Sequence, residues 1–104
     1  MKPLYLIAAI GVALLTACNQ QNNFPPPVTE QAARYSPHAV VELQKGRELF
    51  ARRCNECHVL PAVASNPANE WPHIVEWMAR RADISEIERK LITSYLVAAR
   101  EDKL

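Results

Sequence analysis

The chain has 104 residues, with 12 basic and 11 acidic side chains. This length allows one small domain. The near balance of charge and the lack of a polybasic tract exclude the electrostatic footprint of a nucleic-acid-binding protein, so we expect no nucleic-acid partner.

Residues 1–17 have the pattern of an export signal. Lys2 precedes an apolar run from Leu4 to Leu15, and small residues follow that run. A helix that spans a bilayer needs roughly 20 apolar residues, so this run of about twelve is too short for a permanent anchor. We therefore predict that residues 1–17 are a signal peptide that is cleaved from the protein.

The signal ends in Leu15-Thr16-Ala17-Cys18, which resembles the lipobox of bacterial lipoproteins. The resemblance implies cleavage before Cys18 and lipidation of the new N-terminal cysteine, whose acyl chains would make a stable membrane anchor. The protein would then be held on the periplasmic side of a membrane, with Asn19 favouring the outer membrane. The alternative is an ordinary secretory leader with an incidental cysteine.

The segment from Cys18 to Tyr35 has the composition of a linker. Asn and Gln dominate its start, and three consecutive prolines follow Phe24. Such a segment cannot bury an apolar face, and its prolines favour extended polyproline II geometry. We expect the lipidated cysteine and the linker to fill residues 18–35, and the folded domain to fill residues 36–104.

Two amphipathic helices are predicted between Ser36 and Ala82. Serine followed by proline favours a helix start, so the first helix should open at Ser36-Pro37 and run to about Arg52. The second helix should begin at residue 69 or 70, with Pro72 in its first turn. The apolar residues of the second helix repeat at the spacing of one helical face: Trp71, Ile74, Val75, Met78 and Ala82.

A third helix should begin at Ser85, where Ser85 and Glu88 are spaced as a capping box. Its predicted buried stripe consists of Ile87, Leu91, Ile92, Tyr95 and Ala98. No segment shows the alternation with period two that is typical of a strand. We therefore predict an all-α domain of three to four helices.

The pentapeptide Cys54-Asn55-Glu56-Cys57-His58 lies between the first two helices. C-x-x-C-H is the attachment motif of c-type haem. The two thiols add to vinyl groups along one porphyrin edge, and the histidine that follows is carried to the iron. A domain this small has a small hydrophobic core and usually needs a disulfide, a metal or a cofactor for stability. We predict one covalent haem c, bonded to Cys54 and Cys57, with His58 as an axial ligand.

Three other sites can be built from the same motif. A thioredoxin-like C-x-x-C needs a strand and helix context that this chain lacks. A zinc site formed by Cys54, Cys57, His58 and His73 would have an unusual spacing and two consecutive ligands. A structural disulfide between the two cysteines is the third alternative.

Met78 is the candidate for the second axial ligand, because it is the only methionine left once the leader is removed. A methionine in an apolar stripe is usually a core residue, but a haem core also needs a distal ligand. Thioether ligation favours ferrous iron and raises the reduction potential. The alternatives are His73, His38, or an open position at which a five-coordinate iron would bind a gas or a peroxide.

Residues 38–104 resemble class I cytochromes c. The run from Gly46 to Phe50 leads into Cys54, and Tyr95 lies on the last helix. In that family a glycine on the first helix lets an aromatic residue of the last helix cross closely, and Gly46, Phe50 and Tyr95 match these roles. The chain departs from many members in the short span between the haem histidine and Met78, and in placing this methionine on a helix.

These features predict an electron carrier rather than an enzyme, because beyond one haem the chain has no room for a substrate pocket. The expected partners are redox proteins, and the protein would act as a monomer or as a fixed subunit of a larger dehydrogenase or reductase. Two arginine pairs, Arg52-Arg53 and Arg80-Arg81, have three possible roles. They would form a basic rim that attracts an acidic partner, or neutralise the haem propionates, or carry charges that are simply solvated.

Overall fold

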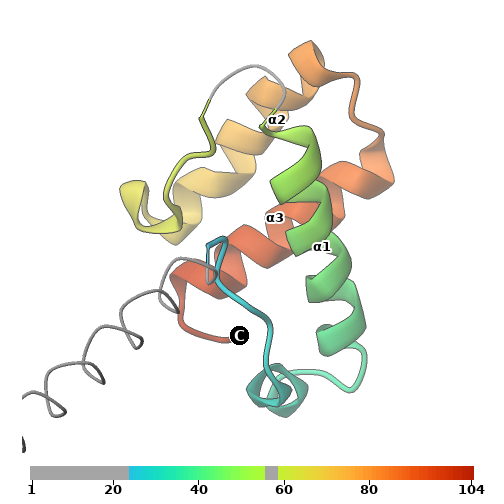
Figure 1. Cartoon of the computed structure of the whole chain (residues 1–104), viewed down its shortest axis with the longest axis vertical. Helices are drawn as coiled ribbons and strands as arrows, with labels where there is room; N and C mark the ends of the chain where they lie inside the picture. Colours follow the sequence, from blue (N-terminus) through green and yellow to red (C-terminus); the bar gives the residue numbers. More distant parts are fainter. Residues whose placement is uncertain (1–23, 56–58) are drawn as a thin grey trace, which may run out of the picture.

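The computed structural model describes residues 24–55 and 59–104 (Figure 1). This part of the chain is all-α and contains no strand, so the predicted all-α fold class is confirmed. Its three α-helices are α1 (Ala39–Arg53), α2 (Trp71–Ala82) and α3 (Glu86–Arg100). Three short 3-10 helices lie between and before them: η2 (Glu30–Arg34), η3 (Val63–Ser65) and η4 (Ala68–Glu70).

The helix starts follow local sequence signals, with one difference. α3 begins with the predicted capping box, in which the Ser85 hydroxyl accepts from the Glu88 N–H and the Glu88 carboxylate accepts from the Ser85 N–H, each at 3.2 Å. α1 begins at Ala39 rather than at Ser36. The reason is a turn in which the Ser36 carbonyl accepts from the Ala39 N–H at 3.1 Å, so Ser36 precedes the helix instead of capping it.

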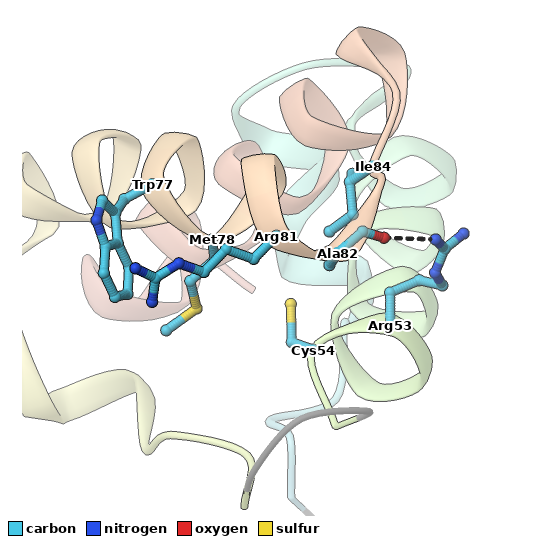
Figure 2. Close-up of a pocket in the computed structure, with 7 residues that line it drawn as sticks. All are labelled: Arg53, Cys54, Trp77, Met78, Arg81, Ala82 and Ile84. Carbon is cyan, nitrogen blue, oxygen red and sulfur yellow. Dashed lines mark hydrogen bonds between the residues drawn. The ribbon is translucent and has the colours of Figure 1, made fainter.

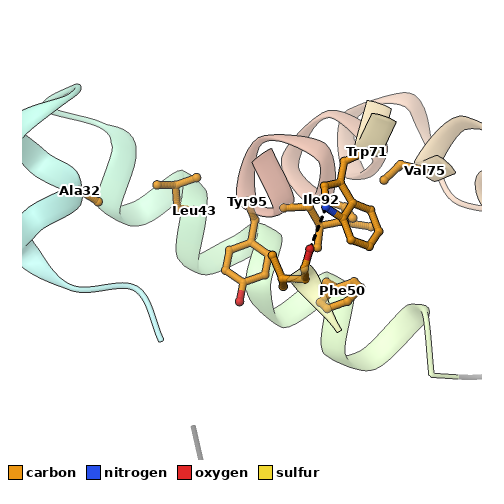
Figure 3. Packing of buried hydrophobic residues seen from close by; sticks show 9 residues of the cluster. Ala32, Leu43, Phe50, Trp71, Val75, Ile92 and Tyr95 are labelled. Atoms are coloured by element: carbon orange, nitrogen blue, oxygen red, sulfur yellow. Dashed lines mark hydrogen bonds between the residues drawn. The ribbon is translucent and has the colours of Figure 1, made fainter. Parts of the chain in front are cut away.

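α1 and α3 cross at Gly46 (Figure 1). A Cβ atom on Gly46 would lie 2.7 Å from the Tyr95 Cβ and would collide with the backbone carbonyl of Leu91. The rings of Phe50 and Tyr95 meet beside this crossing, with 6.1 Å between their centroids (Figure 3). Only a residue without a side chain allows two helices to approach this closely, so the expected role of Gly46 is confirmed.

The buried face of α3 differs from the predicted one at its first turn. Ile92 and Tyr95 are fully buried as predicted, but Ile87 is 73% exposed, and Leu96 is buried in its place. Ile87 and Ile92 are five residues apart, which is about 140° around a helix, so they cannot both face the same core. The direction of the core is set by Ile92, Tyr95 and Leu96 together.

The loop before α2 is fixed by a buried hydrogen bond. The Trp71 indole N–H donates to the Val63 carbonyl at 3.1 Å (dashed line in Figure 3). Trp71 is 1% exposed and Val63 is 6% exposed, so water does not compete for this bond. Because Trp71 is the first residue of α2, the bond sets where this helix enters the domain.

Residues 24–35, which the composition assigned to a linker, pack against the helices. The Tyr95 hydroxyl donates to the Pro26 carbonyl at 2.6 Å, and the Arg47 Nε donates to the same carbonyl at 3.1 Å. Ala32 is fully buried in the core cluster. The physical reason is that extended, proline-rich backbone leaves its carbonyls unused, so side-chain donors can bind them. Burial raises the pKa of Tyr95 to about 12, against an opposing effect of the Arg47 charge.

Candidate functional site

Cys54 closes α1. It is the C-cap residue of this helix, and its N–H donates to the Phe50 carbonyl at 3.2 Å. Phe50 is 1% exposed and packs against Tyr95, so the turn that carries Cys54 is anchored to the crossing of α1 and α3. Cys54 itself is half-buried against the edge of the core cluster.

Met78 lies on α2, at the border of its buried face. Val75 and Ala79 are buried, while Met78 is half-buried. α2 packs on α3, where Arg89 reaches the carboxylate of Glu76. The Arg89 Nη1 lies 2.9 and 2.8 Å from the two carboxylate oxygens, so an ion pair joins α2 to α3.

Cys54 and Met78 line the same hollow, which has a volume of about 190 Å³ (Figure 2). In Figure 2 the Cys54 thiol points toward α2, and the Met78 thioether extends from α2 into the same space. The remaining lining residues are Arg53, Trp77, Arg81, Ala82 and Ile84. The structure therefore brings together two sulfur-bearing residues that the sequence singled out, although they come from different helices.

The hollow is too small to enclose a whole porphyrin. Pockets that enclose a small-molecule ligand typically measure about 300–1,000 Å³. A group bound at this hollow of about 190 Å³ would thus be covered on one part and exposed on another. One apolar side chain of the hollow, Trp77, is also 50% exposed. Exposed apolar groups beside a pocket are typical of a surface that a ligand or partner covers.

Arg53 lines the hollow and contacts the other two helices. Its Nη2 donates to the carbonyl of Ala82 at 3.0 Å and to the carbonyl of Asp83 at 3.3 Å. Its Nη1 lies 3.8 Å from the carboxylate of Glu88. Of the three roles expected for the arginine pairs, a solvated charge is wrong for Arg53, because these contacts join it to the end of α2 and the first turn of α3.

The second arginine pair also has neighbours. The Arg81 guanidinium lies over the Trp77 ring, 3.8 Å from the ring centroid, as a cation–π contact at the rim of the hollow. Arg80 forms an exposed ion pair with Glu76, one turn earlier on α2, at 3.9 Å. Of these two arginines, only Arg81 therefore places its charge on the side of α2 that carries Met78.

Three of the predicted site residues lie outside the described part of the chain. Cys57 and His58 of the haem motif and the lipidation site Cys18 belong to residues 1–23 and 56–58. Among residues 24–55 and 59–104, no group of three or more His, Cys, Asp or Glu side chains is placed to hold a metal ion. The zinc alternative depends on Cys57 and His58, so it stays untested.

The two alternative histidine ligands differ in position. His38 precedes α1, at the opposite end of this 15-residue helix from Cys54. A helix of this length is about 22 Å long, which places His38 out of reach of a group bound at Cys54. His73 is exposed, and with Ile74, Trp77 and Met78 it lines a second hollow. His73 is therefore the histidine that competes with Met78 on geometric grounds.

Sequence reasoning missed Ile84 and Trp77 as lining residues. Ile84 follows Asp83, whose left-handed backbone (φ 52°) ends α2, and it precedes the N-cap of α3. An apolar residue just before an N-cap often packs against the first turns of the helix as a hydrophobic staple, so the sequence already indicated that Ile84 is a packing residue. Trp77 lies outside the apolar stripe of α2, and only its position next to Met78 hints at the site.

None of the helices in the described part of the chain is long and apolar enough to cross a membrane. A comparison with protein-family models, curated proteins and solved structures found no match. The interpretation of the site therefore rests on the motif and on the geometry around Cys54 and Met78.

Proposed function

We propose that this protein is a small c-type cytochrome that carries single electrons through one covalent haem. Cys54 and Cys57 would hold the porphyrin through thioether bonds, His58 would be one axial ligand, and Met78 would be the other. The observation that carries this proposal is that Cys54 and Met78 line one hollow. A C-x-x-C-H motif with a methionine thioether near its first cysteine suits a haem c site with histidine and methionine ligation.

The described residues suit such a group chemically. The walls of the hollow are mostly apolar, with Trp77, Ala82 and Ile84 next to the two sulfur-bearing residues. Met78 and Ala82 are four residues apart, so they share one face of α2. When bound, haem would supply an iron that alternates between the ferrous and ferric states. Met78 would stabilise the ferrous state, which raises the reduction potential.

Partial enclosure suits electron transfer better than substrate chemistry. A porphyrin that is only partly covered by the hollow keeps an exposed edge, where redox partner proteins can approach. The close crossing at Gly46 supports a class I cytochrome c arrangement, since it reproduces the helix contact expected from that resemblance. The lipobox resemblance supports lipid anchoring through Cys18 on the periplasmic side of a bacterial membrane, with the outer membrane favoured.

The test is production of the full chain in bacteria that attach haem and process lipoproteins. The intact mass should correspond to a chain that starts at Cys18 and carries acyl groups and one haem, and the pyridine haemochrome spectrum should be that of haem c. A Cys54→Ser, Cys57→Ser double variant should lose the haem and keep the lipid. Cys18→Ser should lose the lipid and keep the haem. A colourless wild-type protein at the mass of polypeptide plus lipid would overturn the proposal.

A further inference from the structure

Arg53 binds backbone carbonyls that have no partner within their own helix. The last carbonyls of an α-helix lack intrahelical donors, and Ala82 and Asp83 stand at this end of α2. A cation at a helix C-terminus also interacts favourably with the helix dipole. Hydrogen bonds from a charged guanidinium are stronger than neutral ones, so this contact holds the last turn of α2 firmly.

The contact lies next to both sulfur-bearing residues. Arg53 directly precedes Cys54, and Ala82 lies one helical turn after Met78 on the same face of α2. The bond between the Arg53 Nη2 and the Ala82 carbonyl, at 3.0 Å, therefore links the two walls of the hollow, next to Cys54 in sequence and one helical turn from Met78. A change in this link would alter the position of Met78 relative to Cys54.

Among the described residues, α1 and α2 are joined mainly through their neighbours. α1 packs mainly on α3 and on η2, whereas α2 packs mainly on α3 and on η4. α3 is thus the common support of both helices, and Arg53 is a direct bridge between them. Its ion pair with Glu88 extends the bridge to the first turn of α3, so a single side chain joins all three helices.

We propose that Arg53 is a positioning residue, which holds α2 so that the Met78 thioether reaches the haem iron. This inference rests on the proposed haem function. It differs from the two earlier functional interpretations of Arg53, because it is based on the hydrogen bonds from the Arg53 Nη2 to the Ala82 and Asp83 carbonyls. Without Arg53, the Ala82 and Asp83 carbonyls at the end of α2 would lose this donor, and Met78 would leave the iron more often.

Competition by an added ligand measures how often Met78 leaves the iron. Imidazole binds ferric haem only where the methionine has dissociated, so its apparent affinity rises with the population of that open state. Arg53→Ala should bind imidazole about tenfold more tightly than wild type, which corresponds to the loss of one charge-assisted hydrogen bond. The weak red absorption band of iron–methionine bonding in the ferric protein should decrease in parallel.

Arg52→Ala is the matched control, because Arg52 is the exposed neighbour with the same charge. It should leave the imidazole affinity within about twofold of wild type, which is the range expected for an exposed substitution. Arg53→Lys keeps the positive charge but replaces the planar guanidinium by a single ammonium group. Its imidazole affinity should therefore lie between those of wild type and Arg53→Ala. This variant also keeps the proposal testable if Arg53→Ala fails to fold.

The outcomes separate the two proposals. A wild-type protein without haem would overturn the proposed function before Arg53 is tested. A wild-type protein that has haem and the iron–methionine band, together with equal imidazole affinities in the Arg52 and Arg53 variants, would overturn only the role of Arg53. Far-ultraviolet circular dichroism that matches wild type would show that the variants are folded when their affinities are compared.

Discussion

Replacing Gly46 by alanine should destabilise the domain, although alanine is the better helix former. The added Cβ would lie 2.7 Å from the Tyr95 Cβ, whereas carbon atoms pack best at about 3.5–4.0 Å. It would also collide with the Leu91 carbonyl, which is backbone and cannot rotate away. α3 would therefore have to move by about 1 Å, and the packing of Phe50 on Tyr95 would be disturbed.

Two destabilising contributions and one stabilising contribution set the change in the free energy of unfolding. Overpacking costs about 1–3 kcal/mol, and a disturbed aromatic pair costs about 1 kcal/mol more. The higher helix propensity of alanine returns about 1 kcal/mol. The net loss is about 1–3 kcal/mol, which lowers the melting temperature of a domain of this size by about 4–24 °C.

Thermal unfolding followed by circular dichroism measures this loss on the haem-loaded protein. Lys45→Ala is the control, because Lys45 is exposed on the same helix and its replacement should change the stability by about 0.5 kcal/mol or less. A Gly46→Ala protein that melts at or above the wild-type temperature would refute the close crossing, since helix propensity would then be the only effect at work.

Three further predictions concern the core and the N-terminal segment. Trp71→Phe should lower the free energy of unfolding in urea by about 1–3 kcal/mol, because the buried Val63 carbonyl loses its donor; an unchanged midpoint would contradict this bond. Tyr95 keeps its proton up to about pH 12 when folded but only to about pH 10 when unfolded, so stability should fall by about 3 kcal/mol as pH rises through this window. Tyr95→Phe should remove that part of the loss and the exposed Tyr35→Phe should not, as measured by urea unfolding at several pH values. Arg47→Ala should remove the side-chain donor of the Pro25 carbonyl and one of the two donors of the Pro26 carbonyl, and so speed proteolysis within residues 24–35. Equal cleavage of wild type and variant would show that the Arg47 contact does not hold the segment.

The parts of the fold that follow from short sequence patterns were predictable. The capping box depends on two residues three positions apart, so Ser85 and Glu88 are enough to locate the start of α3. The crossing at Gly46 followed from a family resemblance, which supplied a partner on a distant helix that no local pattern contains. The face of α3 was less predictable, since Ile87 satisfies helical spacing with Leu91 but points away from the core.

The packing of residues 24–35 was not predictable from composition. The linker interpretation considered only apolar burial, and this segment attaches largely through its backbone carbonyls. Their donors, Arg47 and Tyr95, lie far along the chain, so the contacts exist only after α1 and α3 have packed. The same reasoning applies to Arg53, whose carbonyl partners are brought near by the tertiary fold.

Two residues of the candidate site could be predicted from their side-chain chemistry. The C-x-x-C-H motif identifies Cys54 by itself, and Met78 followed from the lack of another methionine in the processed chain. Their shared hollow could not be inferred from the sequence, because it depends on the angle between α1 and α2. Ile84 and Trp77 complete that hollow and were found only in the structure.

Proton and carbon NMR of the reduced, haem-loaded protein tests the central claim most directly. If the leader is removed as proposed, the chain has one methionine, and labelling the methionine methyl group with carbon-13 gives a single signal from Met78. If Met78 binds the iron, the porphyrin ring current will shift this signal far upfield of the position of an ordinary methionine methyl group. A methyl signal at the ordinary position would contradict the assignment of Met78 as a ligand of the haem iron.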